Sequence, residues 1–170
     1  MRNLAYWVCN VGKGKLGVMP RPLGGESLES QMERLKGEGT DVLVSMLTES
    51  EIDKLDLRRE PEACSKKGIR FLNFPIQDQN VPPDRASFGQ LVRDLTSELL
   101  AGKGVVIHCH GGIGRSGLTA ACILVGQGRS PEAACLTVSM ARRYEVPSTE
   151  QQRLWISSWA SEPTYVPDQE

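Results

Sequence analysis

One stretch of the chain, HCHGGIGRSG at residues 108–117, gathers residue types that can perform covalent chemistry. The glycines at 111, 112 and 114 let the backbone come close to a ligand, because they carry no side chain that would block it. Arg115 adds a planar, permanently charged fork that matches the oxygens of a phosphate group. Cys109 would lie beside it as a nucleophile, since a cysteine next to an arginine at the start of a helix is expected to be a thiolate at neutral pH. The stretch therefore predicts a backbone loop that holds a tetrahedral oxyanion above a thiolate.

The elements on either side of this stretch suit such a loop. Residues 104–109 are almost all apolar, which predicts a central strand covered on both faces of a sheet. Residues 115–125 predict a helix that the glycine loop opens. The start of a helix presents unpaired N–H groups and the positive end of its dipole, so it attracts anions. Ser116 at this start is expected to donate a hydrogen bond to the sulfur and to ease its departure in a second chemical step.

The motif His-Cys, five residues, Arg-Ser is similar to the signature of the protein tyrosine phosphatase superfamily. The chain resembles the small dual-specificity phosphatases, in the kinase-associated, cyclin-dependent kinase inhibitor 3-like branch. The likeness rests on the stretches PIQDQNVPPD, VVIHCHGGIGRSGLTAACILV and SPEAA. The resemblance implies a cysteine phosphatase fold and a protein phosphatase that acts on phosphotyrosine, and also on phosphoserine and phosphothreonine. It implies a phosphocysteine intermediate on Cys109, and a supporting role for His108. The implied phosphate-binding residues are His110, Gly111, Gly112, Ile113, Gly114 and Arg115.

A phosphomonoester needs a proton for its leaving oxygen, which a carboxylic acid near the pocket can supply. By the resemblance, Asp78 in PIQDQNVPPD is the acid in the first step and the base towards water in the second. An Asx-turn is the structural alternative for Asp78. Asp84 is the competing carboxylate, but it follows two prolines and precedes a predicted helix, so it is expected to be an N-cap.

The start of the last predicted helix offers a further candidate. Ser148 and Gln151 have the spacing of a capping box, in which both side chains bind backbone N–H groups. The resemblance offers another interpretation, in which Gln151 orients the water that attacks phosphocysteine, with Gln152 one residue away. Both interpretations stay open from the sequence.

Strands and helices alternate along the rest of the chain, which favours an α/β fold with a central, mainly parallel sheet of about five strands flanked by helices. We expect residues 1–170 to form a single phosphatase domain, since this length is ordinary for one domain. The expected strands are 4–9, 16–19, 41–47, 69–75 and 104–109. The expected helices are 26–36, 48–55, 84–101, 115–125, one from 130 and one from about 148.

Charge and cysteine content narrow the class of protein. The formal net charge of -1 argues against general attraction to nucleic acid or to an acidic membrane surface. The apolar run near the start is too short for a secretory signal, and none is long enough to span a bilayer. Five cysteines, an odd number without regular spacing, favour reduced thiols, so we expect a cytoplasmic protein. The expected partner is a phosphorylated protein or peptide.

Several other functions fit the sequence less well. No metal or other cofactor is expected, because both histidines of the chain lie at 108 and 110 with no second ligand cluster. A nucleotide-binding P-loop would need a different glycine spacing and a lysine. Another phosphomonoesterase remains an alternative. So does a sulfurtransferase or arsenate reductase, although rhodanese-type loops usually have four residues between cysteine and arginine and need no general acid. A phosphoprotein-binding module would typically lack the cysteine, the arginine or the acid. The loop carries no lysine for a polyphosphorylated lipid, and Arg142 and Arg143 are expected on solvated helix faces.

Overall fold

The computed structural model describes residues 2–160, which are built around a five-stranded sheet of order β1-β2-β5-β3-β4. The strand pairs β2–β5, β5–β3 and β3–β4 are parallel, and β1 and β2 form an antiparallel hairpin at one edge. This arrangement confirms the predicted mainly parallel sheet of five strands. The strands are β1 Tyr6–Val11, β2 Gly14–Pro20, β3 Val42–Ser45, β4 Arg70–Asn73 and β5 Gly104–Cys109.

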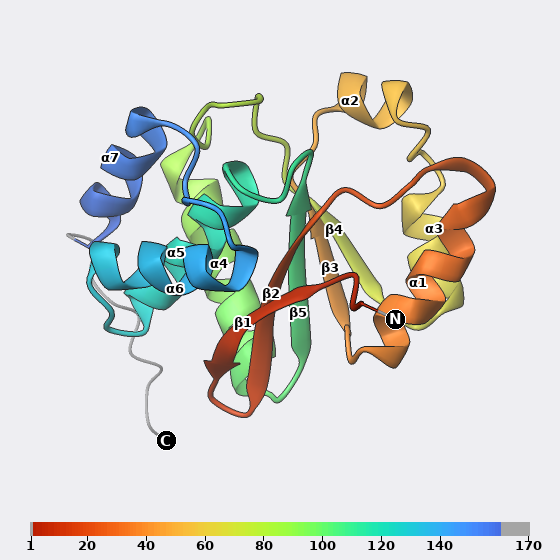
Figure 1. The fold of residues 1–170 in the computed structure, drawn as a ribbon, viewed down its shortest axis with the longest axis horizontal. Helices are drawn as coiled ribbons and strands as arrows, with labels where there is room; N and C mark the ends of the chain where they lie inside the picture. The colour runs from red at the N-terminus through yellow and green to blue at the C-terminus, as the bar shows by residue number, and fades with distance from the viewer. Residues whose placement is uncertain (1, 161–170) are drawn as a thin grey trace.

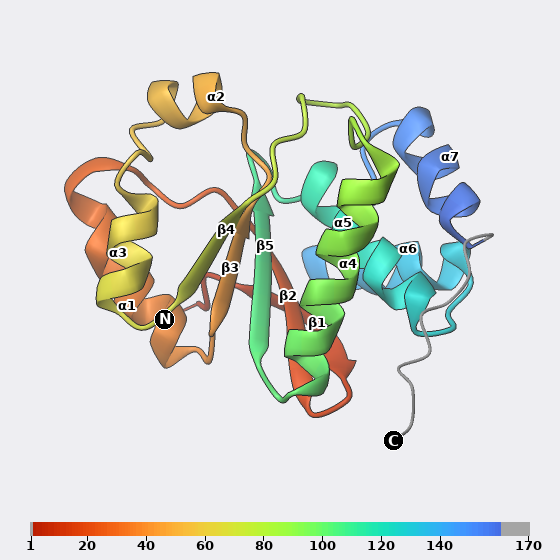
Figure 2. The same cartoon turned by 180° about the vertical axis from the view of Figure 1, so that it is seen from behind.

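Helices cover both faces of the sheet. Helices α1 and α3 lie on one face, and α4, α5, α6 and α7 lie on the other, as Figures 1 and 2 show from opposite sides. The short helix α2 lies beyond the end of the sheet, near the tips of the strands. The helices are α1 Leu28–Gly37, α2 Glu49–Lys54, α3 Glu60–Lys66, α4 Arg85–Leu100, α5 Arg115–Gly126, α6 Pro131–Arg142 and α7 Glu150–Trp159, with a 3-10 turn at Gly25–Ser27.

Strand β5 is the centre of the core. All six of its residues are buried, as the apolar run predicts. Its side chains alternate between the two layers, so Val105 and Ile107 join the cluster under α4–α7, while Val106 joins the cluster under α1 and α3. Because both faces of β5 are packed, the cysteine at its end is held on a rigid support.

Local signals in the sequence account for several helix ends. Asp84 caps α4 by accepting a hydrogen bond of 2.8 Å from the N–H of Ser87, as predicted. Ser130 caps α6 by accepting one from the N–H of Ala133, with Pro131 in the first turn. The predicted apolar stripe of α4 is buried, and its members are Phe88, Leu91, Val92, Leu95 and Leu99.

Two features differ from the sequence-based expectations. Helix α3 was not expected, because its seven residues include Pro61 and bury only two apolar side chains, Ala63 and Cys64, which makes no helical stripe. The predicted capping box of Ser148 with Gln151 is wrong by one residue, because Thr149 and Gln152 form the capping box of α7. Within residues 2–160, no helix is long and apolar enough to cross a membrane.

Candidate active site

The candidate site lies where β5 ends and α5 begins. Because β2, β3, β4 and β5 all run parallel, their carboxyl ends meet at one edge of the sheet. The glycine loop, α2 and the segment between β4 and α4 gather at this edge, at the top of Figure 1. This is the edge at which open α/β sheets bind ligands. The fold thus brings α2 and the segment between β4 and α4 to the cysteine, although both lie far from it in the chain.

Cys109 lies on the floor of the loop and is 3% exposed. Its Sγ accepts a hydrogen bond of 3.3 Å from the N–H of Gly112, and lies 3.3 Å from the Oγ of Ser116. The predicted contact between Ser116 and the sulfur is therefore present. These two contacts hold the sulfur in one position at the floor of the loop.

The glycines of the loop are required by close backbone packing. Gly112 has a φ of +70°, and a Cβ there would lie 2.4 Å from the carbonyl carbon of Met19. A Cβ on Gly114 would lie 2.8 Å from the Oγ of Ser148. The carbonyl of His110 accepts a hydrogen bond of 3.1 Å from the N–H of Arg21. These contacts clamp the loop between the end of β2 and the start of α7.

Arg115 is almost fully buried, and its guanidinium faces two carboxylates. Glu51 of α2 accepts bonds of 2.8 Å from NH1 and 2.9 Å from NH2, in a two-pronged pair. NH1 also donates to the carbonyl of Ile76 at 2.8 Å, and NH2 lies 3.2 Å from Oδ1 of Asp78. Among the described residues, the Nε–H has no hydrogen-bond acceptor. A phosphate that bound Nε and NH2 together would therefore take the place of Asp78 at NH2.

The pair of Glu51 and Arg115 keeps both groups charged. Burial alone would lower the pKa of Arg115, but the hydrogen bond to Glu51 and the negative charges near it raise that pKa. Partial burial would raise the pKa of Glu51, but hydrogen bonds from Arg115 and from the N–H of Thr48 lower it to about 2. Glu51 thus does two things: it closes the capping box of α2 and it orients Arg115.

Replacing Glu51 with Gln is expected to lower kcat/KM for a phosphate ester about tenfold, because one amide oxygen replaces two charged acceptors on Arg115.

The same substitution is expected to lower the free energy of unfolding. The pKa of Glu51 is lower in the folded chain, about 2 against 4.5, so the stabilisation by its carboxylate is present above pH 4.5 and is lost as the pH falls towards 2. Urea unfolding should show the variant less stable by about 1–2 kcal/mol at pH 7, a value reduced for solvent screening.

The control for this variant is Glu49→Gln, on the same helix. The Glu49 side chain is 81% exposed and pairs with Arg58 at 3.3 Å, and such surface pairs contribute little. It should leave kcat/KM and the stability near those of the unchanged protein. If the stability difference of Glu51→Gln were the same at pH 2 and pH 7, the ion pair would not be its cause.

Asp78 and Asp84 lie in different environments. The Asp78 side chain is 67% exposed and reaches NH2 of Arg115, at the mouth of the site. Asp84 serves as the cap of α4, and hydrogen bonds from Ser87 hold its pKa below the usual value. Of the two carboxylates, only Asp78 contacts a residue of the phosphate loop among the described interactions.

His108 lies beneath the loop in a fully buried pair. Its Nε2 is 2.7 Å from Oε1 of Glu60, and its Nδ1 is 3.3 Å from the carbonyl of Cys109. Glu60 stands at the start of α3 and is 1% exposed. Because both ring nitrogens face oxygen acceptors, the pair holds the imidazole in one orientation under the backbone of Cys109. The supporting role of His108 stays a prediction, and this buried pair is the contact on which it rests.

The structure brings Gln152, and not Gln151, to the loop. Gln152 is fully buried; its Oε1 accepts from the N–H groups of Ser148 and Thr149, and its Nε2 donates to the carbonyl of Asn80 at 3.1 Å. Its side chain also lies against Gly114. Gln151 is exposed and makes no hydrogen bond among the described residues. The water-orienting role of Gln151 therefore stays a prediction without a contact at the site.

Sequence reasoning missed three charged residues of the site: Glu51, Glu60 and Arg142. Arg142 was expected on a solvated helix face, but it is 5% exposed and donates to the carbonyls of Gly112 and Gly111 at 2.8 and 3.0 Å. The expectation for Arg142 was wrong because helical periodicity does not show which residues the neighbouring loop will cover. Glu51 belongs to the capping box of α2, whereas Glu60 is an acidic residue in the first turn of α3, which has no side-chain cap.

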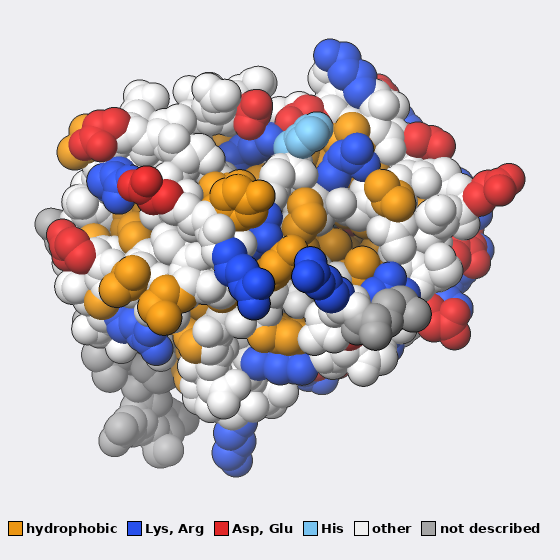
Figure 3. Space-filling model, viewed as in Figure 1, with side chains coloured by type: hydrophobic (Ala, Val, Ile, Leu, Met, Phe, Trp, Pro, Cys, Tyr) orange, Lys and Arg blue, Asp and Glu red, His pale blue; other side chains and the backbone are white. Residues whose placement is uncertain are grey.

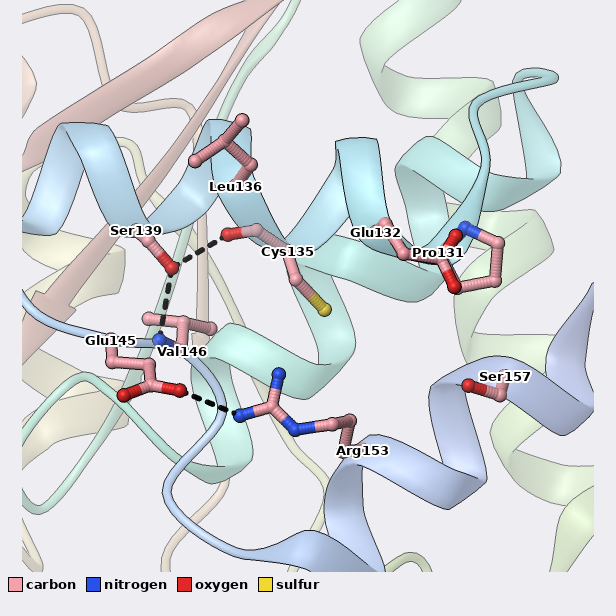
Figure 4. A pocket seen from close by; sticks show the side chains of 9 residues that line it. All are labelled: Pro131, Glu132, Cys135, Leu136, Ser139, Glu145, Val146, Arg153 and Ser157. Atoms are coloured by element: carbon pink, nitrogen blue, oxygen red, sulfur yellow. Dashed lines mark hydrogen bonds and ion pairs between the residues drawn. The ribbon is translucent and has the colours of Figure 1, made fainter.

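Other features of the chain lie away from this site. A cavity of about 290 Å³ opens between α6 and α7, lined in part by Cys135, Val146 and Arg153 (Figure 4).

The thiols outside the site differ from Cys109 in their surroundings. Burial raises the pKa of Cys9, Cys64, Cys122 and Cys135, and it raises that of Cys64 to about 12. Over residues 2–160, no group of three or more His, Cys, Asp or Glu side chains could hold a metal ion.

Comparison with known proteins agrees with this geometry. A family model described as "Tc-R-P: Polymorphic toxin system, DSP-PTPase phosphatase" matches residues 9–129. Cyclin-dependent kinase inhibitor 3 of Homo sapiens is 33% identical over 99 residues, which are 58% of this chain and 46% of that protein. Protein tyrosine phosphatase domain-containing protein 1 of Mus musculus is 35% identical over 96 residues, 56% of this chain and 13% of that protein. The match thus spans less than half of these relatives.

Solved structures agree in fold. The kinase associated phosphatase (KAP) with its catalytic-site cysteine substituted by serine superposes with a TM-score of 0.82 at 24% identity, over 96% of this chain and 99% of that chain. Tk-PTP in its active form gives a TM-score of 0.78 at 22% identity, over 96% and 100%. These likenesses confirm the cysteine phosphatase fold, and with the relatives they confirm the kinase-associated resemblance. The chain therefore belongs to the family of DSP-PTPase phosphatases.

Proposed function

We propose that the chain is a protein phosphatase that hydrolyses phosphotyrosine, and also phosphoserine and phosphothreonine, through a phosphocysteine on Cys109. The observation that carries this proposal is the position of the Cys109 sulfur at the end of β5, 3.3 Å from the N–H of Gly112 and 3.3 Å from the Oγ of Ser116 at the start of α5. A sulfur in this position is poised for in-line attack on a phosphorus atom held above it. We include residues 1–170 in one phosphatase domain, working in the cytoplasm with its five cysteines as free thiols.

In the first step, the Cys109 thiolate attacks phosphorus, a sulfur–phosphorus bond forms, and the ester oxygen leaves. Asp78 gives its proton to that oxygen, so the leaving group departs as a neutral alcohol or phenol. Arg115 binds the phosphoryl oxygens through Nε and NH2, while Glu51 holds the opposite edge of the guanidinium. The backbone of His110, Gly111, Gly112, Ile113 and Gly114 completes the cradle around the phosphate.

In the second step, water attacks the phosphorus and the sulfur–phosphorus bond breaks. Asp78, now a carboxylate, accepts the proton of that water, which restores the acid for the next cycle. The electron pair of the broken bond returns to sulfur, and the hydroxyl of Ser116 donates a hydrogen bond that stabilises this thiolate. His108 and Glu60 keep the Cys109 backbone in place throughout.

The surface supports a phosphorylated protein or peptide as substrate. The loop between Cys109 and Arg115 carries no lysine that would meet further phosphates, which favours a single phosphomonoester. On the face viewed in Figure 3, Lys and Arg side chains gather over β1 and β2, while Asp and Glu lie towards the margins. Such a separation of charge attracts an acidic partner to this face although the net charge is -1.

The test is a substrate panel on the purified chain. We expect release of phosphate from para-nitrophenyl phosphate and from phosphotyrosine peptides, with slower release from phosphoserine and phosphothreonine peptides, because phenols leave more easily than alkoxides. Chelator should leave the rate unchanged, and vanadate should inhibit it as a mimic of five-coordinate phosphorus. Turnover of phosphoserine alone would contradict the expected order.

The same panel separates the other candidate functions. Thiocyanate formed from thiosulfate and cyanide, without phosphate release, would identify a sulfurtransferase. Reduction of arsenate with a thiol reductant, again without phosphate release, would identify an arsenate reductase. Binding of phosphopeptides with no turnover would identify a binding module. Each of these results would replace the phosphatase proposal.

A further inference from the structure

Arg142 is a buried cation on the outer side of the phosphate loop. It is the last residue of α6, and its Nε and NH2 donate to two successive carbonyls, Gly112 at 2.8 Å and Gly111 at 3.0 Å. Its guanidinium lies 4.2 Å from the ring centre of Tyr6 and 5.5 Å from that of Tyr144. A cation held between aromatic rings and away from water interacts strongly with nearby dipoles.

The geometry of the peptide unit links these two bonds to the site. A peptide is planar, and its C=O and N–H point in opposite directions. The carbonyl of Gly111 therefore shares a plane with the N–H of Gly112, which donates to Sγ of Cys109 at 3.3 Å. In the same way, the carbonyl of Gly112 shares a plane with the N–H of Ile113. Arg142 thus fixes the outer ends of two successive peptides, and the inner end of the first donates to the sulfur.

The peptide between Gly111 and Gly112 can rotate easily, because glycine restricts its backbone dihedrals less than any other residue. Hydrogen bonds to its carbonyl are therefore needed to hold it in one orientation. Gly111 has no neighbour within 4 Å of an added Cβ, and Gly112 takes a φ of +70° that glycine adopts freely. A rotation of the peptide between them would point its carbonyl at the thiolate and remove a donor from the cradle. The two hydrogen bonds from Arg142 oppose this rotation.

The segment that follows α6 is tied both to α6 and to α5. The Oγ of Ser139 accepts from the N–H of Val146 at 2.9 Å and donates to the carbonyl of Cys135 at 2.7 Å, as Figure 4 shows. A Cβ on Gly117 would lie 2.4 Å from Cγ1 of Val146, so this segment packs directly on α5. The last turns of α6, which end in Arg142, are therefore tied to a segment that packs on the helix that the phosphate loop opens.

We infer that Arg142 is a positioning residue of the reaction, which aims the N–H groups of Gly112 and Ile113 at the sulfur and the transferring phosphoryl group. This inference rests on the proposed phosphatase function. The guanidinium does not touch the substrate; it acts through the two carbonyls. The planar guanidinium is required, because its Nε and NH2 donate at the same time to the carbonyls of two successive residues.

The test compares Arg142→Met, Arg142→Lys and, as the matched control, Arg143→Met. Met keeps an unbranched apolar stem, shorter than that of Arg and without a donor, and Lys keeps the charge without the fork. We expect kcat/KM for para-nitrophenyl phosphate to fall about 10- to 30-fold in Arg142→Met and about 3- to 10-fold in Arg142→Lys, below the loss seen when an oxyanion donor is deleted outright. Arg143 is exposed, and its variant should stay within about twofold.

A second readout separates positioning from folding. The inhibition constants of vanadate and of inorganic phosphate are measured at a temperature at which thermal unfolding shows each variant to be folded. Positioning predicts that the vanadate constant rises by the same factor by which kcat/KM falls, since vanadate resembles the transition state. A loss of kcat with unchanged vanadate and phosphate constants would overturn the inference, since it indicates fewer folded molecules. If Arg142→Met does not fold, the Lys variant decides by the same comparison.

The anion constants also separate this inference from the proposed function. Calorimetry of phosphate or vanadate binding requires no turnover. A chain that binds vanadate but hydrolyses no phosphate ester would refute the proposed function, and the ratio of vanadate affinities between Arg142→Met and the unchanged chain would still decide the role of Arg142. Equal affinities in the two proteins would overturn it.

Discussion

Replacing Cys109 with serine is expected to reduce the hydrolysis of para-nitrophenyl phosphate at least about 10⁴-fold, in the range seen when other enzymes lose their nucleophile. The serine hydroxyl is not ionised at neutral pH, so the attacking anion is lost. The cradle stays, because the N–H of Gly112, the hydroxyl of Ser116 and the guanidinium of Arg115 come from other residues. Phosphopeptide affinity, measured by calorimetry, should therefore remain within about threefold of the unchanged chain.

Cys9→Ser is the control for this substitution. Burial raises the pKa of the Cys9 thiol, so it is not expected to be ionised at neutral pH, and its loss should leave the rate unchanged. Iodoacetate should inactivate the unchanged chain and the Cys9→Ser variant equally, and phosphate should protect both. Retained turnover in Cys109→Ser, or inactivation that phosphate does not slow, would assign the nucleophile to another group.

The sequence was informative about this centre because the centre is local. Cys109, Gly112, Arg115 and Ser116 lie within eight residues, between a strand and a helix that are each visible from their apolar patterns. The geometry of such a loop depends mostly on its own residues and on the two elements beside it. Its prediction therefore required no knowledge of contacts between distant parts of the chain.

The charged residues around the centre could not be found in that way. Glu51 lies 64 residues from Arg115, and Glu60 lies 48 residues from His108. Near in sequence, each is simply an acidic residue in the first turn of a short helix, which is common because of the helix dipole. The order of strands in the sheet places β3 beside β5. This order brings α2 and the start of α3, which follow β3 in the chain, close to the carboxyl end of β5.

The start of α7 shows how a small error arises. Ser148 and Thr149 are both good N-cap residues, and Gln151 and Gln152 both lie three residues after one of them. The capping pattern alone therefore allows two registers. The register is decided by tertiary contacts, since Gln152 is buried where its Nε2 reaches the carbonyl of Asn80.

Replacing Asp78 with asparagine is expected to lower kcat about 10²- to 10³-fold for phosphotyrosine peptides and to remove the basic limb of the pH–rate profile. The basic limb in the unchanged chain reports loss of the proton that the acid must donate. Asparagine has no such proton, so the rate should no longer fall as the pH rises. The profile is measured with para-nitrophenyl phosphate and with a phosphotyrosine peptide.

The contact between Asp78 and Arg115 gives the physical reason for this assignment. Without substrate, the carboxylate lies 3.2 Å from NH2 of Arg115. A phosphate that binds Nε and NH2 takes this cation from Asp78 and places a dianion beside it. The contact thus places the carboxyl group of Asp78 at the mouth of the site, beside the guanidinium that would bind the phosphate.

Asp84→Asn is the matched control, because asparagine caps a helix about as well as aspartate and α4 should remain intact. Hydrogen bonds from Ser87 lower the pKa of Asp84, so this carboxyl group holds no proton to donate at neutral pH. Across a series of aryl phosphates, the Asp78 variant should lose most rate with the most basic phenols, because these depend most on a proton. The Asp84 variant should keep the leaving-group dependence of the unchanged chain. The opposite result, with the steeper dependence and the lost basic limb in Asp84→Asn, would assign the acid to Asp84.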